Sequence, residues 1–171
     1  YILDDKGEIK LHTIQAWHAT NYSNVNEAST VLRAEFKGFS ALITGDAEQG
    51  GEYRLLSKYK GQIQSTVLRT GHHGSRTSTI APFLNEVQPR HAIISVGRYN
   101  SYNHPTPDVV NRLTSSGINI FRTDYHGNIM FVTDGEKIKI SYDGDFSDEK
   151  KSQVLAIDRE AWGLAQSNDE A

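Results

Sequence analysis

The sequence predicts an α/β layered domain, in which strands alternate with helices between a leading and a closing hairpin. Three observations lead to this prediction. Segments with the apolar pattern of strands are separated by segments whose apolar residues recur at helical spacing. Turn and helix-start signals stand between these segments. The length of 171 residues is enough for one domain with its own hydrophobic core.

The N-terminal part predicts a lead-in followed by a hairpin. Residues 1–25 form the lead-in, within which Ile9 to Trp17 alternates enough to be a strand. Thr30 to Phe36 alternates between apolar and polar residues and predicts a second strand. Lys37-Gly38 is a turn signal, and the apolar run Ser40 to Thr44 completes the hairpin.

The central part predicts a helix, a strand and a second helix. Glu48 to Tyr59 has apolar residues at helical spacing and ends at Gly61. Ser65 to Thr70 has the composition of a buried strand. Ser78 or Thr79 is expected to cap the next helix. The apolar face of that helix is Ile80, Phe83, Leu84 and Val87.

The C-terminal part begins with His91 to Val96, a nearly all-apolar strand that we expect to be covered on both faces. Thr106-Pro107 is a helix start, and the helix is expected to run to Gly117. Residues 143–171 predict an acidic linker and a helix over Glu149 to Leu164. Before them, three short strands are expected in a closing meander: Asn119 to Thr123, Asn128 to Val132 and Lys137 to Ser141.

Composition excludes several classes of protein. The net charge of −3 excludes a global attraction to nucleic acid, so a role on DNA would need a local basic patch. The absence of cysteine excludes disulfides and thiolate metal ligands. No apolar run is long enough to cross a membrane. Because the chain does not begin with Met, we expect it to start part-way through a gene product. We expect a cytoplasmic location, or an extracytoplasmic one if the chain is attached to a channel.

Ligand-type residues follow three of the predicted strands. Asp46 comes after a strand and Gly45, and its carboxylate can bridge two cations or cap the next helix. His72 and His73 stand between glycines, where one imidazole can bind a metal while the other reaches substrate. His104 precedes a proline, which restricts its backbone to extended conformations.

Each of these signals alone also has a structural interpretation, as a helix cap, a polar turn or a surface histidine. Together they form a set that can converge at one edge of a sheet. Mixed oxygen and nitrogen ligands suit divalent metals, and a metal-bound hydroxide can attack a phosphorus or carbonyl centre. Ser75 can donate to a phosphate or act as a cap, and Arg76 can bind phosphate. The remaining histidines are expected to be structural or exposed: His12, His18, His91 and His126.

The order and spacing of these motifs resembles a known family. The ordered set is Asn26-x-x-Ser29, Thr44-Gly45-Asp46, Gly71-His72-His73-Gly74-Ser75, Asn100-x-Tyr102-x-His104-Pro105 and Arg122-Thr123-Asp124. Over roughly residues 26–132 it is similar to the metallo-β-lactamase-like domain at the C-terminus of the competence channel protein ComEC, and to its freestanding relatives. The resemblance implies a four-layer αββα sandwich with two divalent ions, zinc or manganese, between the sheets.

The same resemblance implies the roles of individual residues. Asp46, His72 and His104 would be metal ligands, and Asp46, His72 and His73 would be catalytic. Asn26 and Ser29 would match the motif close to the metals. With Ser75 and Arg76, which are candidates through their own phosphate-binding chemistry, they are the predicted substrate-binding residues. The substrate would be a phosphodiester, with single-stranded DNA as the substrate of channel-linked members.

The chain departs from the family at its N-terminal side. The leading metal motif, His-x-(His or Asp)-x-Asp-His, is absent upstream of Asn26. We therefore expect residues 26–142 to be the C-terminal half of the domain. The missing N-terminal half, a partner chain or a second copy would cover the face left open.

The sequence thus predicts a metal-dependent hydrolase, in particular a nuclease that splits phosphodiesters with a metal-activated water. Two alternatives stay open at this point. The first is a degenerate, non-catalytic binding module of the same fold. The second is a hydrolase of a small ester or lactone, with which the acidic net charge agrees equally well.

Overall fold

A computed structural model describes residues 9–15 and 24–144, apart from the side chain of Gln15. The predicted terminal helix over Glu149 to Leu164 lies outside these residues, as do His18 and the end of the first predicted strand. In the part that is described, no helix is both long and apolar enough to cross a membrane.

Within the described residues, the predicted strands and helices are present, with ends shifted by a few residues. The strands are β1 (Ile9–Gln15), β2 (Val31–Phe36), β3 (Phe39–Ile43), β4 (Val67–Arg69), β5 (His91–Ile94), β6 (Asn119–Arg122), β7 (Ile129–Thr133) and β8 (Ile138–Tyr142). The α-helices are α1 (Gln49–Tyr59), α2 (Ala81–Val87), α3 (Pro107–Ser115) and α4 (Thr123–His126). Two short 3-10 helices are η2 (Val25–Ala28) and η3 (Gly71–Gly74).

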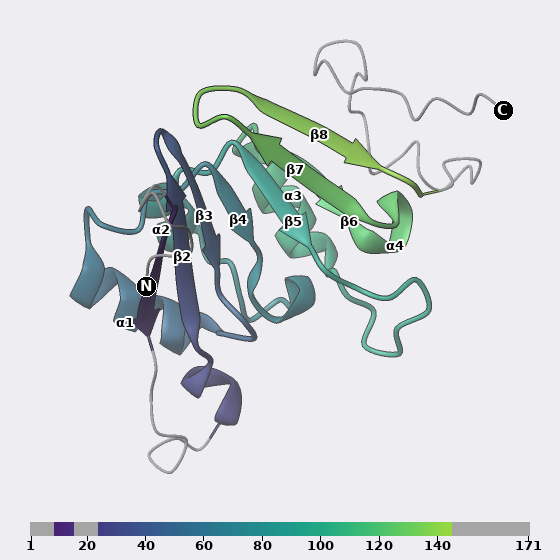
Figure 1. Ribbon diagram of the computed structural model, residues 1–171. Coiled ribbons are helices and arrows are strands. Elements are labelled where there is room, and N and C mark those ends of the chain that lie inside the picture. The colour runs from purple at the N-terminus through teal and green to yellow at the C-terminus, as the bar shows by residue number, and fades with distance from the viewer. Residues whose placement is uncertain (1–8, 16–23, 145–171) are drawn as a thin grey trace, which may run out of the picture.

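The first six strands form one sheet, in the order β1-β2-β3-β4-β5-β6 (Figure 1). Strands β1 to β3 pair antiparallel, whereas β3 to β6 pair parallel through helical crossovers. The prediction of a closing meander is wrong, because α3 returns the chain so that β6 lies parallel to β5. Of the three strands predicted for the meander, only β7 and β8 pair with each other, as an antiparallel hairpin that makes a separate two-stranded sheet.

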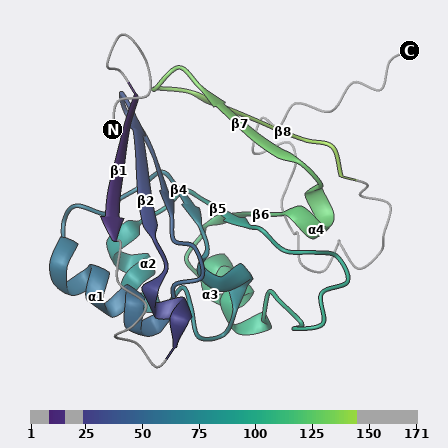
Figure 2. The same cartoon turned by 60° about the horizontal axis from the view of Figure 1, so that its bottom comes forward.

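Helices α1, α2 and α3 cover one side of the large sheet, and the β7–β8 hairpin lies on the other side (Figure 2). The prediction of a mixed α/β layered domain is therefore confirmed. The described residues supply one helical layer, one six-stranded sheet and one two-stranded sheet.

The hydrophobic core lies between the large sheet and its helices. The sheet contributes Leu42, Leu68, Ala92, Ile94 and Ile120, and the helices contribute Leu55, Phe83, Leu84, Val87, Val109 and Leu113. Burying one such Leu, Ile or Phe side chain stabilises the fold by about 1.5–3 kcal/mol. These contacts hold the parallel strands in register and so set the positions of the loops that follow them.

The opposite face of the sheet is covered only in part. Phe131 of β7 packs against Phe121 and His91, with ring centroids 5.5 Å and 5.7 Å apart. Ile43 of β3 stays 41% exposed on that face. The expectation that the strand from His91 would be covered on both faces is met on one face only: Ala92 and Ile94 on the core side are buried, whereas His91 and Ile93 on the opposite face are half-buried.

The prediction that Ser78 or Thr79 caps the second helix is wrong. The residue before α2 is Ile80, and no side chain of its own segment caps the helix. The carboxylate of Glu52 on α1 instead accepts the backbone N–H groups of Thr79 and Ile80. The hydroxyl of Ser78 donates to the carbonyls of Gly71 and Ser75, so it is not available to a helix.

Candidate functional site

The segments that follow β3, β4 and β5 meet at one edge of the sheet. Ile43 lies opposite Arg69 in the register, and Arg69 lies opposite Ile93, so the three strands end side by side. Loops leaving the carboxyl ends of parallel strands are where α/β proteins gather functional groups. Asp46, the His72-His73 pair and His104 all stand in these loops.

Asp46 and His73 face each other across this edge. The Nε2 atom of His73 lies 3.5 Å from Oδ1 of Asp46, and Nη1 of Arg69 lies 3.8 Å from the same oxygen. The Nδ1 atom of His73 lies 2.6 Å from the carbonyl oxygen of Ser95, so we assign its proton to Nδ1. In the neutral ring, the lone pair of Nε2 then faces Asp46.

His72 and His104 form the deeper part of the cluster, with ring centroids 5.6 Å apart. The Nδ1 atom of His72 lies 3.1 Å from Oε1 of Glu48, but in a direction that makes no hydrogen bond. The Nδ1 atom of His104 is likewise buried without a hydrogen-bond partner. A buried polar atom without a partner costs free energy, which makes both nitrogens candidates for binding a ligand.

The electrostatics of the cluster favour metal-binding protonation states. Burial lowers the pKa of His104, and the neighbouring His72 and His73 lower it further. Neutral imidazole, the form that binds metals, is therefore favoured at His104. Burial alone would raise the pKa of Glu48, but hydrogen bonds from neighbours including Asn26 outweigh it and the pKa is lowered. Glu48 is therefore favoured as a carboxylate.

Backbone geometry explains why glycines flank the two histidines. His72 and His73 have φ of 45° and 54°, a left-handed conformation that costs about 1–2 kcal/mol for each residue with a Cβ. Gly74 has φ of 80°, and a Cβ there would lie 2.6 Å from Cβ of Pro105. The short helix η3 thus packs directly on the loop that carries His104.

Two asparagines hold the surrounding loops. The side chain of Asn100 accepts the backbone N–H of His104 at 2.9 Å and donates to its carbonyl at 2.8 Å. Asn26 donates through Nδ2 to Oε1 of Glu48 at 2.9 Å. Ser29 accepts the backbone N–H of Asp46 at 3.0 Å. Asn26 and Ser29 therefore reach the cluster, where their observed contacts are with its acidic residues.

Ser75 and Arg76, the other two predicted substrate residues, have partners elsewhere. Ser75 is buried, and its hydroxyl lies 3.0 Å from that of Thr77. Arg76 is exposed and pairs with Asp108 at 2.7 Å. Their roles in substrate binding stay predictions.

The other predicted structural histidines occupy separate places. His12 is exposed on β1 and pairs with Glu35 at 2.9 Å. His126 is buried on α4, where its Nδ1 contacts the backbone of Arg122. Both positions agree with the expectation for these residues.

A cavity of about 570 Å³ opens beside His73. Its volume is within the range of small-molecule binding sites, about 300–1,000 Å³. It is bounded by the end of β5, the start of α4 and the base of the β7–β8 hairpin, through Ser95, Val96, Gly97, Thr123, Gly127, Asn128 and Asp143. The sequence offered no signal for this cavity, because its walls come from segments up to 70 residues apart.

Glu48 is the site residue that sequence reasoning missed. It lies two residues after Asp46, and an Asp-x-Glu spacing after a strand is the signal that could have identified it. Its carboxylate places an oxygen beside His72, as Asp46 does beside His73.

The donor set fits part of a metal site. Among residues 9–15 and 24–144, no group of three or more His, Asp or Glu side chains is arranged closely enough to hold a metal ion. The two unsatisfied imidazole nitrogens and two nearby carboxylates are nevertheless ligand types that zinc and manganese accept. The residues present therefore fit such an ion, with further ligands needed to complete its coordination.

Comparison with known proteins shows similarity to competence proteins. No family model matches the chain. It is 46% identical over 106 residues to "Competence protein ComA" of Neisseria gonorrhoeae, which is 62% of this chain and 15% of that protein. It is 36% identical over 124 residues to "ComE operon protein 3" of Bacillus subtilis, covering 72% of this chain and 16% of the relative.

A third relative, "Recombination protein 2" of Haemophilus influenzae, is 42% identical over 88 residues, which cover 52% of this chain and 11% of that protein. The chain therefore spans only about one sixth or less of the length of these relatives. Their names support a relationship to competence proteins.

Proposed function

We propose that this chain is the C-terminal half of a metal-dependent hydrolase with a metallo-β-lactamase-like fold, acting on phosphodiesters. One observation carries the proposal. His72 and His104 bury two imidazole nitrogens without hydrogen-bond partners where the loops after β3, β4 and β5 meet, with the carboxylate of Glu48 beside His72 and that of Asp46 beside the adjacent His73. Such an arrangement costs stability unless it serves a ligand.

The chain's own residues would hold and orient the reacting groups. Asp46, His72 and His104 would hold the metal, and Glu48 adds a second carboxylate. When bound, a zinc or manganese ion supplies a Lewis acid and a water that ionises near neutral pH. His73, held by the Ser95 carbonyl through Nδ1, lines the cavity and has Nε2 left to accept or return a proton.

The cavity beside His73 would take the substrate. Asn128 lines it with a side-chain amide, of which one N–H donates to Asp143 and the second can donate to a phosphate oxygen, whereas the hydroxyl of Thr123 donates to the carbonyl of Val96. Because the named relatives include competence proteins, we propose single-stranded DNA as the phosphodiester.

The remaining ligands and the second large sheet would come from outside the described residues. We propose that the N-terminal half of the parent protein, a partner chain or a second copy supplies them. The relatives are long enough for this, since the chain matches only 15–16% of the first two.

The test is metal uptake by the full chain in equilibrium dialysis against zinc or manganese, followed by elemental analysis. We expect about one metal ion or more per chain, with loss of uptake in Asp46→Asn and in His72→Ala. Asp108→Asn and His12→Ala are matched controls, because they make the same kinds of change at exposed ion pairs away from the cluster. Uptake that is negligible, or equal in Asp46→Asn and Asp108→Asn, contradicts the proposal.

Hydrolysis would be measured on bis(p-nitrophenyl) phosphate and on a neutral ester, p-nitrophenyl acetate. Metal-dependent cleavage of the phosphodiester that is lost in Asp46→Asn supports the nuclease. Faster cleavage of the neutral ester, with no dependence on salt, supports the small-ester hydrolase instead, because binding to nucleic acid weakens steeply with salt.

A non-catalytic binding module is the second candidate. It is favoured by one observation, the lack of any three-residue metal group within the described ranges. Binding of single-stranded DNA without metal uptake would support it over the hydrolase.

A further inference from the structure

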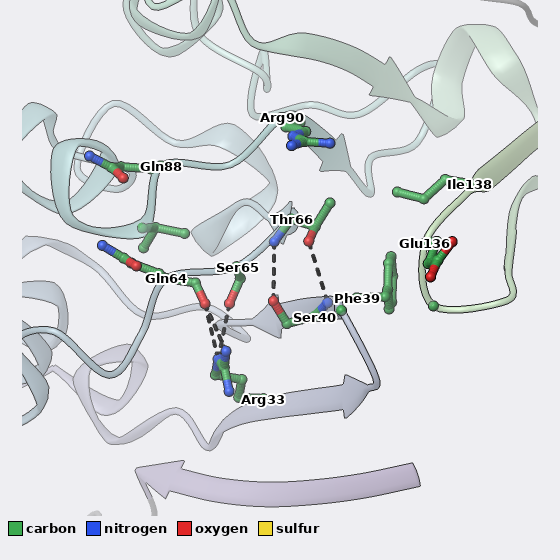
Figure 3. Close-up of a pocket in the computed structure, with 13 residues that line it drawn as sticks. Arg33, Phe39, Ser40, Gln64, Ser65, Thr66, Gln88, Arg90, Glu136 and Ile138 are labelled. Atoms are coloured by element: carbon green, nitrogen blue, oxygen red, sulfur yellow. Dashed lines mark hydrogen bonds between the residues drawn. The ribbon is translucent and has the colours of Figure 1, made fainter. Parts of the chain in front are cut away.

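We propose a second binding site, for a nucleotide phosphate, at the edge of the sheet opposite the histidine cluster. A polar cavity of about 370 Å³ lies there (Figure 3). In this view Ser40 and Thr66 lie at its centre, with Gln64 and Gln88 on one side and Phe39, Glu136 and Ile138 on the other. The site goes beyond the proposed hydrolase and does not depend on it.

The cavity is separate from the candidate metal site. Ser40 stands at the start of β3, Thr66 just before β4, and Arg90 just before β5. These are the N-terminal ends of strands β3, β4 and β5, whereas Asp46, His72 and the other cluster residues follow their C-terminal ends. Parallel pairing places the two groups at opposite edges of the sheet.

The hydroxyl groups of Ser40 and Thr66 in the cavity have their hydrogens available to donate to a ligand. The backbone N–H of Ser40 donates to Oγ1 of Thr66 at 3.4 Å, and the N–H of Thr66 donates to Oγ of Ser40 at 3.3 Å. Each side-chain oxygen is thus an acceptor in a reciprocal pair. Neither hydroxyl donates its hydrogen to a group in the described part of the chain, so both can donate to a ligand.

Arg90 adds a positive charge. Its side chain is exposed, lines the cavity and makes no ion pair with the described residues. Arg33, on the other wall, is instead held by the carbonyl of Gln64, the hydroxyl of Ser65 and the carboxylate of Glu35. A guanidinium beside two hydroxyl donors and two amides is a donor-rich environment, which matches the oxygens of a phosphate.

The residues at the other end of the cavity indicate which group would be attached to the phosphate. Phe39 and Ile138 form an apolar wall on which a flat ring can pack, and Glu136 adds a carboxylate. That carboxylate disfavours inorganic phosphate alone but accepts a hydrogen bond from an exocyclic amino group, as on cytosine. Phosphate, ring and amino group together describe a nucleotide unit, either free or at a position in a single strand.

The experiment is a ¹H–¹⁵N NMR titration of the full chain with deoxycytidine monophosphate, in EDTA. We expect saturable shifts of the amides of residues 39–40, 64–66, 88–91 and 135–138, with a Kd in the millimolar range or tighter. Arg90→Ala should weaken binding about tenfold, the loss of one charged hydrogen bond. Lys58→Ala, which removes one charge from the exposed side of α1, should leave binding unchanged.

Two further titrations compare different bases and different strand lengths. Thymidine monophosphate, which lacks an amino group, should bind several-fold more weakly, and Glu136→Gln should reduce that difference. A short oligodeoxycytidine that shifts the same amides at lower concentration assigns the site to a strand, and equal affinity assigns it to a free nucleotide.

Absence of shifts at these residues, shifts confined to residues 45–48 and 72–73, or equal losses in Arg90→Ala and Lys58→Ala would overturn the proposal. Because EDTA removes any metal, failure of the hydrolase proposal would leave these results unaffected.

Discussion

Replacing Glu52 by alanine would remove the carboxylate that supports the loop carrying His72 and His73. Glu52 is fully buried on α1, and its two oxygens accept the backbone N–H groups of Thr79 and Ile80. Arg112 of α3 donates to the carbonyls of Ser78 and Thr79 in the same loop. One side chain therefore joins the first helix to the segment between η3 and α2.

The expected loss of stability in Glu52→Ala follows from the two backbone N–H groups that lose their acceptor. Each buried N–H without a partner costs about 1–3 kcal/mol. Two unpaired N–H groups and a small cavity together cost more than one such group. Removing the carboxyl group, whose burial is itself unfavourable, offsets part of this loss of stability. We expect Glu52→Ala to lower the free energy of unfolding by about 2–4 kcal/mol. Glu52→Gln keeps one acceptor oxygen and should cost about 1 kcal/mol.

Glu52 also predicts a pH dependence. Burial raises its pKa from 4.5 to about 7, against the opposing effects of the two N–H groups and of Arg112. The folded state then holds the proton more tightly than the unfolded state. The raised pKa of Glu52 therefore stabilises the folded state fully below pH 4.5, and this stabilisation is lost as the pH rises toward 7. At 1.36 kcal/mol for each pKa unit, the loss in the free energy of unfolding is up to about 3 kcal/mol.

The assay is urea unfolding followed by circular dichroism at pH 5 and pH 8. Wild type should lose stability between these pH values, and the Glu52→Gln variant, which cannot titrate, should lose less. Glu136→Ala, an exposed glutamate, is the control. A Glu52→Ala variant within about 0.5 kcal/mol of wild type, or an unchanged pH slope in Glu52→Gln, would refute this account of the loop.

Three further predictions concern the site and its surroundings. Gly74→Ala should destabilise the fold by about 2 kcal/mol or more, measured by thermal melting, since the new Cβ would meet Pro105 at a positive φ. Asp124→Ala should cost about 3–5 kcal/mol in urea unfolding, because it leaves the buried Arg122 without its paired carboxylate. NMR titration of the His104 ring should give a midpoint below 6.5, since burial and the neighbouring histidines lower its pKa; a midpoint above 6.5 contradicts this.

The elements and the principal site residues could be predicted because their signals are local. Apolar alternation identified the strands around Lys37-Gly38, and Thr106-Pro107 identified the start of α3. Asp46, His72, His73 and His104 were found as ligand-type residues that follow strands. Their convergence at one edge of the sheet follows from the parallel pairing of β3, β4 and β5.

The errors have a shared physical cause. The helix cap was expected at Ser78 or Thr79, but Glu52, more than 25 residues earlier in the chain, takes that role. The prediction of a closing meander was wrong because the crossover through α3 places β6 parallel to β5. Glu48 was missed because its importance depends on the position of His72, which the chain brings near only on folding.

By itself, the sequence determined where strands and helices form and which residues have the chemistry of a metal ligand, since propensity, periodicity and residue type act over a few neighbours. Only the tertiary structure decided which of these residues share a surface. It placed His73 against Ser95, left one imidazole nitrogen each of His72 and His104 without a hydrogen-bond partner, and put the polar cavity around Ser40 and Thr66 at the other edge. These contacts join residues 20 or more positions apart, and the packing of the helices against the sheet sets their distances.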